Sequence, residues 1–360
     1  MGVPYYLLRI ICTFLDNRTF TVKIDGVHSR VCKIECGVPQ GGVLSPTLFS
    51  IYINDLPIST IEGETVLLFA DDIVFLKRYK YKKAKKILVE AKIEAQVSVQ
   101  NFLTELETWM GNWRLTLAPK KCSQITFTKA KNTKNDEMNI ELYGEKIKTE
   151  INPKFLGVVF DCRLNFTANV LAVKKKVGDR LNLLKILSYD KSWRLNKKIL
   201  IQMFKCLVLS VVDYASVTAG AVNESSKNEL EILQNNALRI IFKKSLLDKV
   251  RNTTLREMAG VKKIEERHHD LMRDYYERAL ITENPLVDKM FTNYRIFKNR
   301  FNINENLATV GGITQGETLE LIKKHNRLSR KNKETYPTTI CKAEKIVVDL
   351  ILDTYDDLDG

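Results

Sequence analysis

Residues 66–76 are VLLFADDIVFL, two short apolar runs separated by Ala70, Asp71 and Asp72. Each run has the length and the β-branched and aromatic content of a strand, so the segment predicts a β-hairpin with the acidic pair at its turn. Adjacent carboxylates repel each other, and a pair of Mg²⁺ ions with oxygen ligands is the natural compensation. Two such ions can hold the attacking and leaving oxygens of a phosphoryl transfer.

Asp is common in turns for purely local reasons, so the acidic pair alone is weak evidence for a metal site. A second motif changes this interpretation. Residues 37–46 are GVPQGGVLSP and place Gln40 thirty-one residues before Asp71. Glycines let a backbone approach a ligand closely, and a Gln amide can hydrogen-bond a base or sugar edge. Alone, this string fits a structural turn. Together with Phe69–Asp72 it indicates more than an ordinary turn.

The surrounding segments alternate between helical and strand-like patterns. Residues 4–15 predict a helix with Pro at its start, residues 20–34 a hairpin that turns at Asp25-Gly26, and residues 48–56 an apolar helix. A long helix is expected after a lysine-rich run, with an apolar face formed by Val99, Phe102, Leu106, Trp109 and Trp113. Strand-like pieces recur at 123–128, 138–149 and 155–160.

From about residue 167 the apolar period is helical. Three apolar stripes predict packed helices: Val170, Val173, Val177, Leu181 and Leu184; Ile199, Met203, Phe204, Leu207 and Val211; and Leu230, Leu233, Ala237 and Ile241. The predicted fold class is α+β, an antiparallel sheet with packed helices followed by a helical part.

At this point the sequence resembles the reverse transcriptases of non-LTR (LINE-type) retrotransposons, and among them those of jockey-like elements. Residues 37–46 are similar to motif B of that family, and Phe69–Asp72 to its motif C. Residues 53–57 (INDLP) match the signature that commonly follows motif B. Residues 113–115 with 119–122 resemble motif D.

The likeness continues into the second half of the chain, to about residue 290. Residues 155–158 (FLGV) resemble motif E, the primer-grip hairpin, and 214–216 with 233–239 resemble the helical thumb and connector. The resemblance implies a polymerase palm followed by a thumb. The expected domains are 1–163, a partial palm with motifs B to E; 164–245, a helical thumb; and 246–360, a helical connector with a polar tail.

The resemblance also implies roles for individual residues. Asp71 and Asp72 are expected to hold two Mg²⁺ ions, with Mn²⁺ as an alternative, for RNA-directed DNA polymerisation. Lys121 is the expected general acid of motif D, although Lys120 fits equally well and either could be a solvated charge. The residues expected to contact template, nucleotide or primer are Gly37, Pro39, Gln40, Gly41, Phe69, Ala70, Phe155, Leu156 and Gly157. The implied partners are an RNA template, a DNA primer and deoxynucleoside triphosphates.

The start of the chain departs from the family pattern. Family palms carry an earlier strand, motif A, with a Phe-x-Asp pattern whose Asp bridges both metals, and the chain starts thirty-six residues before Gly37. Phe14-Leu15-Asp16 ends a helix rather than a strand. We therefore expect a 5′-truncated polymerase with little or no activity as this chain. The alternative is a non-catalytic RNA- or DNA-binding relic of such an element, and an incidental acidic turn in an interaction protein is a further one.

Charge and composition agree with a polyanionic partner. The 360 residues carry 57 Lys and Arg against 43 Asp and Glu, a net charge of +14. Residues 77–86 (KRYKYKKAKK) interleave seven cations with two Tyr, which suits a phosphate backbone with base stacking, although a solvated helix surface is the alternative. A second basic run at 323–333 and an acidic segment at 349–359 lie in the polar tail.

The sequence also predicts the cellular compartment of the protein. No apolar run approaches the roughly 20 residues that cross a bilayer, and the N-terminus lacks the features of a signal peptide. Seven scattered Cys include Cys32 and Cys36 at zinc-like spacing without a second pair nearby, so we expect reduced thiols. The expected protein is intracellular, nuclear and/or cytoplasmic, neither secreted nor membrane-bound. The sequence leaves the oligomeric state open.

Overall fold

The computed structural model describes residues 3–78, 85–128, 137–189, 195–214, 216, 218 and 222–281. The chain divides into two compact units, Met1–Leu117 and Ala118–Gly360. Most of the first basic run, the second basic run, the acidic segment and Cys341 lie outside the described residues. The other six Cys are free thiols. Among the described helices, none is both long enough and apolar enough to cross a membrane.

The first unit begins with a helix and a hairpin whose two arms pair in two short ladders. Its elements are α1 (Tyr5–Leu15), β1 (Thr19–Phe20), β2 (Lys23–Ile24), β3 (Val27–His28), β4 (Cys32–Lys33), α2 (Ser45–Tyr52), β5 (Glu64–Phe69), β6 (Asp72–Lys77) and α3 (Lys85–Asn112). Strand β1 pairs with β4, and β2 with β3, both antiparallel. Asp25 and Gly26 have φ of 48° and 84°, the positive values of a type I′ turn. This confirms the hairpin predicted at that turn.

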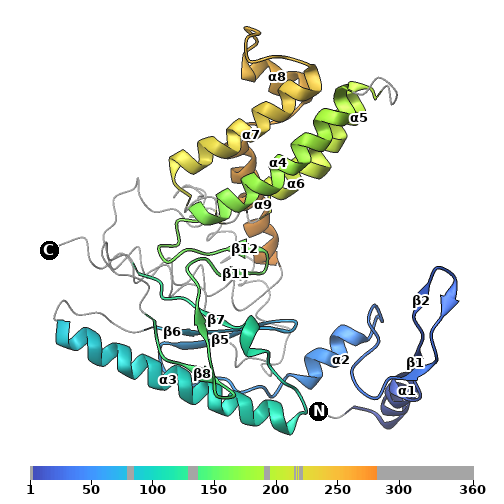
Figure 1. The fold of residues 1–360 in the computed structure, drawn as a ribbon, viewed down its shortest axis with the longest axis vertical. Helices are drawn as coiled ribbons and strands as arrows, with labels where there is room; N and C mark the ends of the chain where they lie inside the picture. The colour runs from blue at the N-terminus through green and yellow to red at the C-terminus, as the bar shows by residue number, and fades with distance from the viewer. Residues whose placement is uncertain are drawn as a thin grey trace, which may run out of the picture. The chain divides into compact units, whose positions relative to one another are not determined.

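Strands β5 and β6 form the hairpin that the sequence predicts around the acidic pair. They are antiparallel, with Glu64 opposite Lys77 at one end and Phe69 opposite Asp72 at the other. Residues directly opposite share a face and faces alternate along a strand. The hairpin lies along α3 (Figure 1). On that face the centroids of the stacked Phe75 and Phe102 rings are 4.2 Å apart.

Helix α3 supplies the buried face of this unit. The stripe predicted for it is confirmed at Phe102, Leu106 and Trp109, which are all buried, whereas Val99 is half-buried. Trp113 lies just beyond the end of the helix and is 36% exposed. Its ring meets that of Tyr52 edge-on, and the Tyr52 hydroxyl donates a hydrogen bond to the Trp113 carbonyl. These contacts connect α2 to the end of α3.

The second unit begins with short strands. They are β7 (Ser123–Gln124), β8 (Glu141–Leu142), β9 (Glu145–Lys146), β10 (Lys148–Thr149), β11 (Lys154–Phe155) and β12 (Val158–Val159). β8 pairs with β9 and β11 with β12 in antiparallel fashion, but β7 and β10 are parallel. Within the described residues, all strands form separate pairs rather than the one antiparallel sheet that we expected. Most of these strands have two residues.

Helices form the rest of the second unit. They are α4 (Thr167–Tyr189), α5 (Lys197–Phe204), a π-helix (Lys205–Leu209), α6 (Ser210–Val212), α7 (Glu224–Phe242), α8 (Asn252–Ala259) and α9 (Ile264–Ile281). Their shared apolar core contains Val177, Phe204 and Ala237, and α4 lies against α7 (Figure 1). The fold is therefore mixed α and β, with the helices gathered in the C-terminal part.

The three predicted helical stripes are confirmed apart from one residue. In α7 every predicted member is buried, and in α4 the members are buried or half-buried. In the remaining stripe Phe204 is buried and Met203, Leu207 and Val211 are partly buried against the core, whereas Ile199 is 45% exposed; the further buried residues of this segment are Leu200, Val208, Leu209 and Val212. The buried residues Leu200, Phe204, Val208 and Val212 repeat every four residues, a spacing that drifts off one face of a regular α-helix with 3.6 residues per turn. The wider π-helical turn at 205–209 brings them back to the same face.

Candidate active site

The tip of the β5–β6 hairpin presents two free carboxylates. Asp71 and Asp72 are both exposed, and in the part of the chain that the structure describes neither has a hydrogen-bond or ion-pair partner. Ala70 adopts φ of +52°, whereas Asp71 does not have a positive φ, as in a type II′ turn. A positive φ is uncommon for Ala and costs of order 1–3 kcal/mol. The turn that carries the acidic pair is therefore strained.

The Asp71 and Asp72 carboxylates supply part of the ligand set that holds a Mg²⁺ ion. Mg²⁺ is usually held by one or two carboxylates together with waters and substrate phosphates. Two unpaired carboxylates at an exposed tip meet that requirement. Among the described residues no group of three or more His, Cys, Asp or Glu side chains comes together. Phe69, which is 61% exposed, shares a face with Asp72 directly opposite it.

The other end of the hairpin is held by a buried ionic cluster. Glu64 accepts a hydrogen bond from Lys77 Nζ at 2.8 Å and further bonds from the hydroxyls of Ser59 and Ser98, the latter on α3. Burial raises the pKa of Glu64, but the hydrogen bonds and the charge of Lys77 outweigh it, so that the pKa lies below its usual value. Lys77 is therefore a partner of Glu64. Our expectation that it binds phosphate within the basic run 77–86 is wrong for this residue.

The Gly/Pro loop at 37–46 is closed by hydrogen bonds of its own. Ser45 is buried, and its hydroxyl donates to the Pro39 carbonyl at 2.5 Å. A Cβ on Gly42 would lie 2.7 Å from Ser45 Oγ, so the loop needs Gly at this position. Arg18 reaches the loop from the end of α1 and donates to the Gly37 carbonyl at 2.5 Å. This framework leaves Gln40 exposed at the loop surface.

The remaining predicted residues lie in the second unit. Lys120 and Lys121 are both exposed on a 3₁₀ turn, Pro119–Lys121, that leads into β7. Phe155 ends β11, and Leu156 and Gly157 form the β11–β12 turn. The structure thus brings Phe69, Ala70 and the acidic pair together on one hairpin and gathers Gly37, Pro39, Gln40 and Gly41 in one loop. It places Lys121 and the motif E residues in a separate unit.

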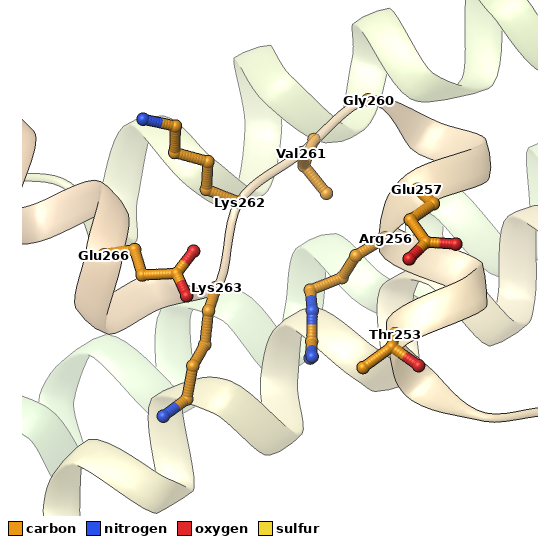
Figure 2. Close-up of a pocket in the computed structure, with 8 residues that line it drawn as sticks. All are labelled: Thr253, Arg256, Glu257, Gly260, Val261, Lys262, Lys263 and Glu266. Carbon is orange, nitrogen blue, oxygen red and sulfur yellow. The ribbon is translucent and has the colours of Figure 1, made fainter.

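Two surface hollows lie away from these residues. Figure 2 shows one, of about 390 Å³, between α8 and α9; its charged lining residues are Arg256, Glu257, Lys262, Lys263 and Glu266. Each of its cations is paired, Arg256 with Glu231, Lys262 with Asp270 and Lys263 with Glu265. The other, about 620 Å³, lies on α1. None of the residues predicted for the site lines either hollow.

Sequence reasoning missed three residues that hold the site. Arg18 and Glu64 gave no signal, because a lone Arg after a helix and a lone Glu at a strand end are both common surface residues. Tyr214, which contacts the motif E turn, lies in a string that was noted only for its resemblance to the thumb. These contacts depend on tertiary pairing rather than on local pattern.

Comparisons with known proteins were made by sequence. Residues 2–160 match the family described as reverse transcriptase (RNA-dependent DNA polymerase). The chain is 27% identical over 295 residues to the RNA-directed DNA polymerase from mobile element jockey of Drosophila melanogaster, which covers 80% of the chain. It is 28% identical over 291 residues to the protein of that name from Drosophila funebris, which covers 79%.

A further relative and the extent of these matches complete the comparison. The chain is 28% identical over 305 residues to the probable RNA-directed DNA polymerase from transposon BS of Drosophila melanogaster, with 79% of the chain covered. The matched part amounts to about 30% of the length of the two jockey proteins and 31% of the transposon BS protein. The chain therefore spans roughly a third of the relatives that it matches.

Proposed function

We propose that residues 2–160, which match the reverse transcriptase family, form a reverse transcriptase region of the kind found in jockey-like, LINE-type retrotransposons, and that the chain contributes to RNA-directed DNA polymerisation. The reaction is the transfer of a deoxynucleotide to a primer 3′-OH on an RNA template. The observation that carries the proposal is the strained hairpin tip inside the matched region, whose two exposed carboxylates have no partner among the described residues. The names of the matched relatives support the same reaction class.

Asp71 and Asp72 are the proposed metal-binding residues. Phosphoryl transfer needs positioning and charge neutralisation more than covalent participation by the protein. Two Mg²⁺ ions, when bound, would supply Lewis-acid stabilisation of the attacking and leaving oxygens. The role of the protein is to hold both carboxylates on one rigid tip. The stacking of Phe75 on Phe102 and the Glu64 cluster on α3 support that rigidity.

The template and incoming nucleotide are proposed to contact the loop at 37–46. Gln40 is exposed on a backbone closed by Ser45 and Arg18, so its amide is free to bond a base or sugar edge. Phe69 and Ala70 are proposed to pack near the primer terminus beside Asp72. Their place at the hairpin tip supports this role.

The second unit is proposed to supply the later motifs. Lys121, or Lys120 beside it, is the proposed donor of a proton to the leaving pyrophosphate, which their exposure allows. Phe155, Leu156 and Gly157 are proposed to grip the primer. With these roles, 1–163 is a partial palm, 164–245 a thumb, and 246–360 a connector with a polar tail. An intracellular location, nuclear or cytoplasmic, follows for a protein that meets RNA template, DNA primer and deoxynucleoside triphosphates.

Ternary-complex formation by the full chain tests this function. An RNA template with a dideoxy-terminated DNA primer is bound to the protein with MgCl₂, and its release is followed after a salt challenge. We expect the complementary deoxynucleoside triphosphate, and none of the other three, to slow the release. Asp71→Asn and Asp72→Asn should lose this effect and keep their binding without nucleotide.

A non-catalytic nucleic-acid-binding protein is the second candidate. It is favoured by the observation that the described residues contain no third acidic, His or Cys side chain grouped with the acidic pair. Such a protein would bind the primer–template with equal release rates for all four nucleotides. That result would contradict the polymerase proposal.

A further inference from the structure

The turn of the β11–β12 hairpin is held by a tyrosine from the helical part of the second unit. Tyr214 follows α6, and its hydroxyl donates a hydrogen bond to the Leu156 carbonyl at 2.6 Å. The ring also covers Gly157, since a Cβ built there would lie 2.9 Å from Tyr214 Cε1. The tyrosine therefore fixes the turn both through a hydrogen bond and by close packing.

The turn needs such support because of its backbone conformation. Leu156 and Gly157 both have positive φ, 45° and 82°, as a type I′ turn requires. Gly adopts that region freely, but a Leu there is an outlier that persists only where its surroundings enforce it. Tyr214 is the described side chain that bonds the Leu156 carbonyl.

Tyr214 is in turn placed by its neighbour Asp213. Arg267, on α9, donates from Nε to both carboxylate oxygens of Asp213, at 3.0 and 2.8 Å, and its Nη2 lies 2.7 Å from Oδ2. His268 Nε2 lies 3.6 Å from Asp213 Oδ1, within ion-pair range and beyond a direct hydrogen bond. Burial raises the pKa of Asp213, but the contacts with His268 and Arg267 outweigh it and keep the pKa below its usual value. Asp213 is therefore a charged anchor between α6 and α9.

These contacts form one continuous path from α9 to the hairpin turn. We propose that Asp213, Tyr214 and Arg267 are positioning residues that set the conformation in which residues 154–159 meet the 3′-terminal nucleotide of a primer strand. The proposal rests on the proposed function, which assigns the primer to this hairpin. Arg267 lies more than a hundred residues beyond the matched region that ends at 160. Helix α9 thereby becomes part of the machinery that handles the primer.

Discrimination between primer ends by the full chain tests the proposal. Fluorescence anisotropy gives the Kd for an RNA–DNA duplex with a recessed DNA 3′ end and for a blunt duplex of equal length. Tyr214→Phe removes the bond to Leu156 and keeps the ring over Gly157. We expect it to lower the preference for the recessed end by about 2- to 10-fold, the range that one hydrogen bond contributes. Tyr189→Phe, at another exposed tyrosine of this unit, should leave the preference unchanged.

A second readout separates positioning from overall stability. A 4-thiothymidine at the primer 3′ end should cross-link to residues 154–159 in the wild type and more weakly in Tyr214→Phe, at equal melting temperature. Arg267→Lys keeps the cation and loses the two-pronged contact with Asp213. We expect an intermediate loss of cross-linking, and no further loss when it is combined with Tyr214→Phe, because both act through one path.

The outcomes distinguish this inference from the function on which it rests. A wild type without preference for the recessed end would contradict the proposed function. A wild type that has the preference, with Tyr214→Phe and Arg267→Lys retaining it and their cross-links, would overturn the positioning role alone. A loss of melting temperature in both variants that parallels the loss of preference would also overturn it, since it would indicate a structural role.

Discussion

Lys77 Nζ lies 2.8 Å from Glu64 Oε1 at the root of the hairpin whose tip carries Asp71 and Asp72. The side chains of the pair are 11% and 2% exposed. Both hydroxyls that complete the cluster belong to the same unit, and Ser98 lies on α3. The cluster therefore fixes the root of the hairpin to α3, at the opposite end from the exposed acidic pair.

Removing the cation of this pair should destabilise the first unit strongly. Lys77→Met leaves the Glu64 carboxylate buried with two hydroxyl donors and no counter-charge, which typically costs about 3–5 kcal/mol. Urea unfolding followed by tryptophan fluorescence measures the change. Lys33→Met, at an exposed position on β4, should stay within about 0.5 kcal/mol of the wild type. Equal effects of the two substitutions would contradict a buried ionic anchor.

Acid should weaken the buried ion pair between Glu64 and Lys77. The pKa of Glu64 in the folded protein lies below the ordinary value of 4.5, so its contribution to the free energy of unfolding is complete above pH 4.5. That contribution is lost as the pH falls from 4.5 through the lowered folded pKa. Urea midpoints between pH 3 and 7 should therefore fall less steeply at the acid end in Glu64→Gln than in the wild type. Identical slopes would contradict a pKa of Glu64 that is lowered on folding.

The loop at 37–46 should not tolerate a methyl group at Gly42. In Gly42→Ala the new Cβ would meet Ser45 Oγ at 2.7 Å and Phe14 Cζ at 3.2 Å, and Ser45 is held by its bond to Pro39. We expect destabilisation of about 1–3 kcal/mol, as for other overpacked sites. Gly111→Ala in α3 meets no atom within 4 Å and should be neutral or stabilising. Thermal unfolding of both variants checks this.

Gln40 should contribute to primer–template binding and not to the stability of the fold. Gln40→Ala removes an exposed amide, so we expect an unchanged melting temperature and a primer–template affinity lowered about 2- to 10-fold, as for one lost hydrogen bond. Gln202→Ala, an exposed glutamine on α5, is the matched control. Equal affinities for the two variants would remove Gln40 from the template contact.

Local pattern predicted much of this fold for identifiable reasons. Alternating apolar residues around Asp25-Gly26 and two short apolar runs around the acidic pair specified two hairpins, and the helical repeat of Leu230, Leu233 and Ala237 specified the buried face of α7. In the segment after residue 196 the prediction failed only at Ile199, where Leu200 is buried instead, because no simple pattern signals a π-helical turn.

The parts that the sequence could not predict depend on contacts between distant segments. Lys77 begins a basic run that was expected to contact phosphates, but it pairs with Glu64 thirteen residues earlier. The bond from Tyr214 to Leu156 joins residues 58 positions apart. The exposure of Asp71 and Asp72, in contrast, was predictable, because they lie at the turn of a two-residue hairpin.

Metal binding at the hairpin tip tests the central claim most directly. Electron paramagnetic resonance counts free Mn²⁺ during titration of the full chain with primer–template and the complementary nucleotide. We expect Mn²⁺ to bind in the wild type and its affinity to fall by at least about 10-fold in Asp72→Asn, because the loss of a ligand exceeds the 10–100-fold typical of residues behind the ligands. An Asp72→Asn chain that binds Mn²⁺ as tightly as the wild type would contradict the account.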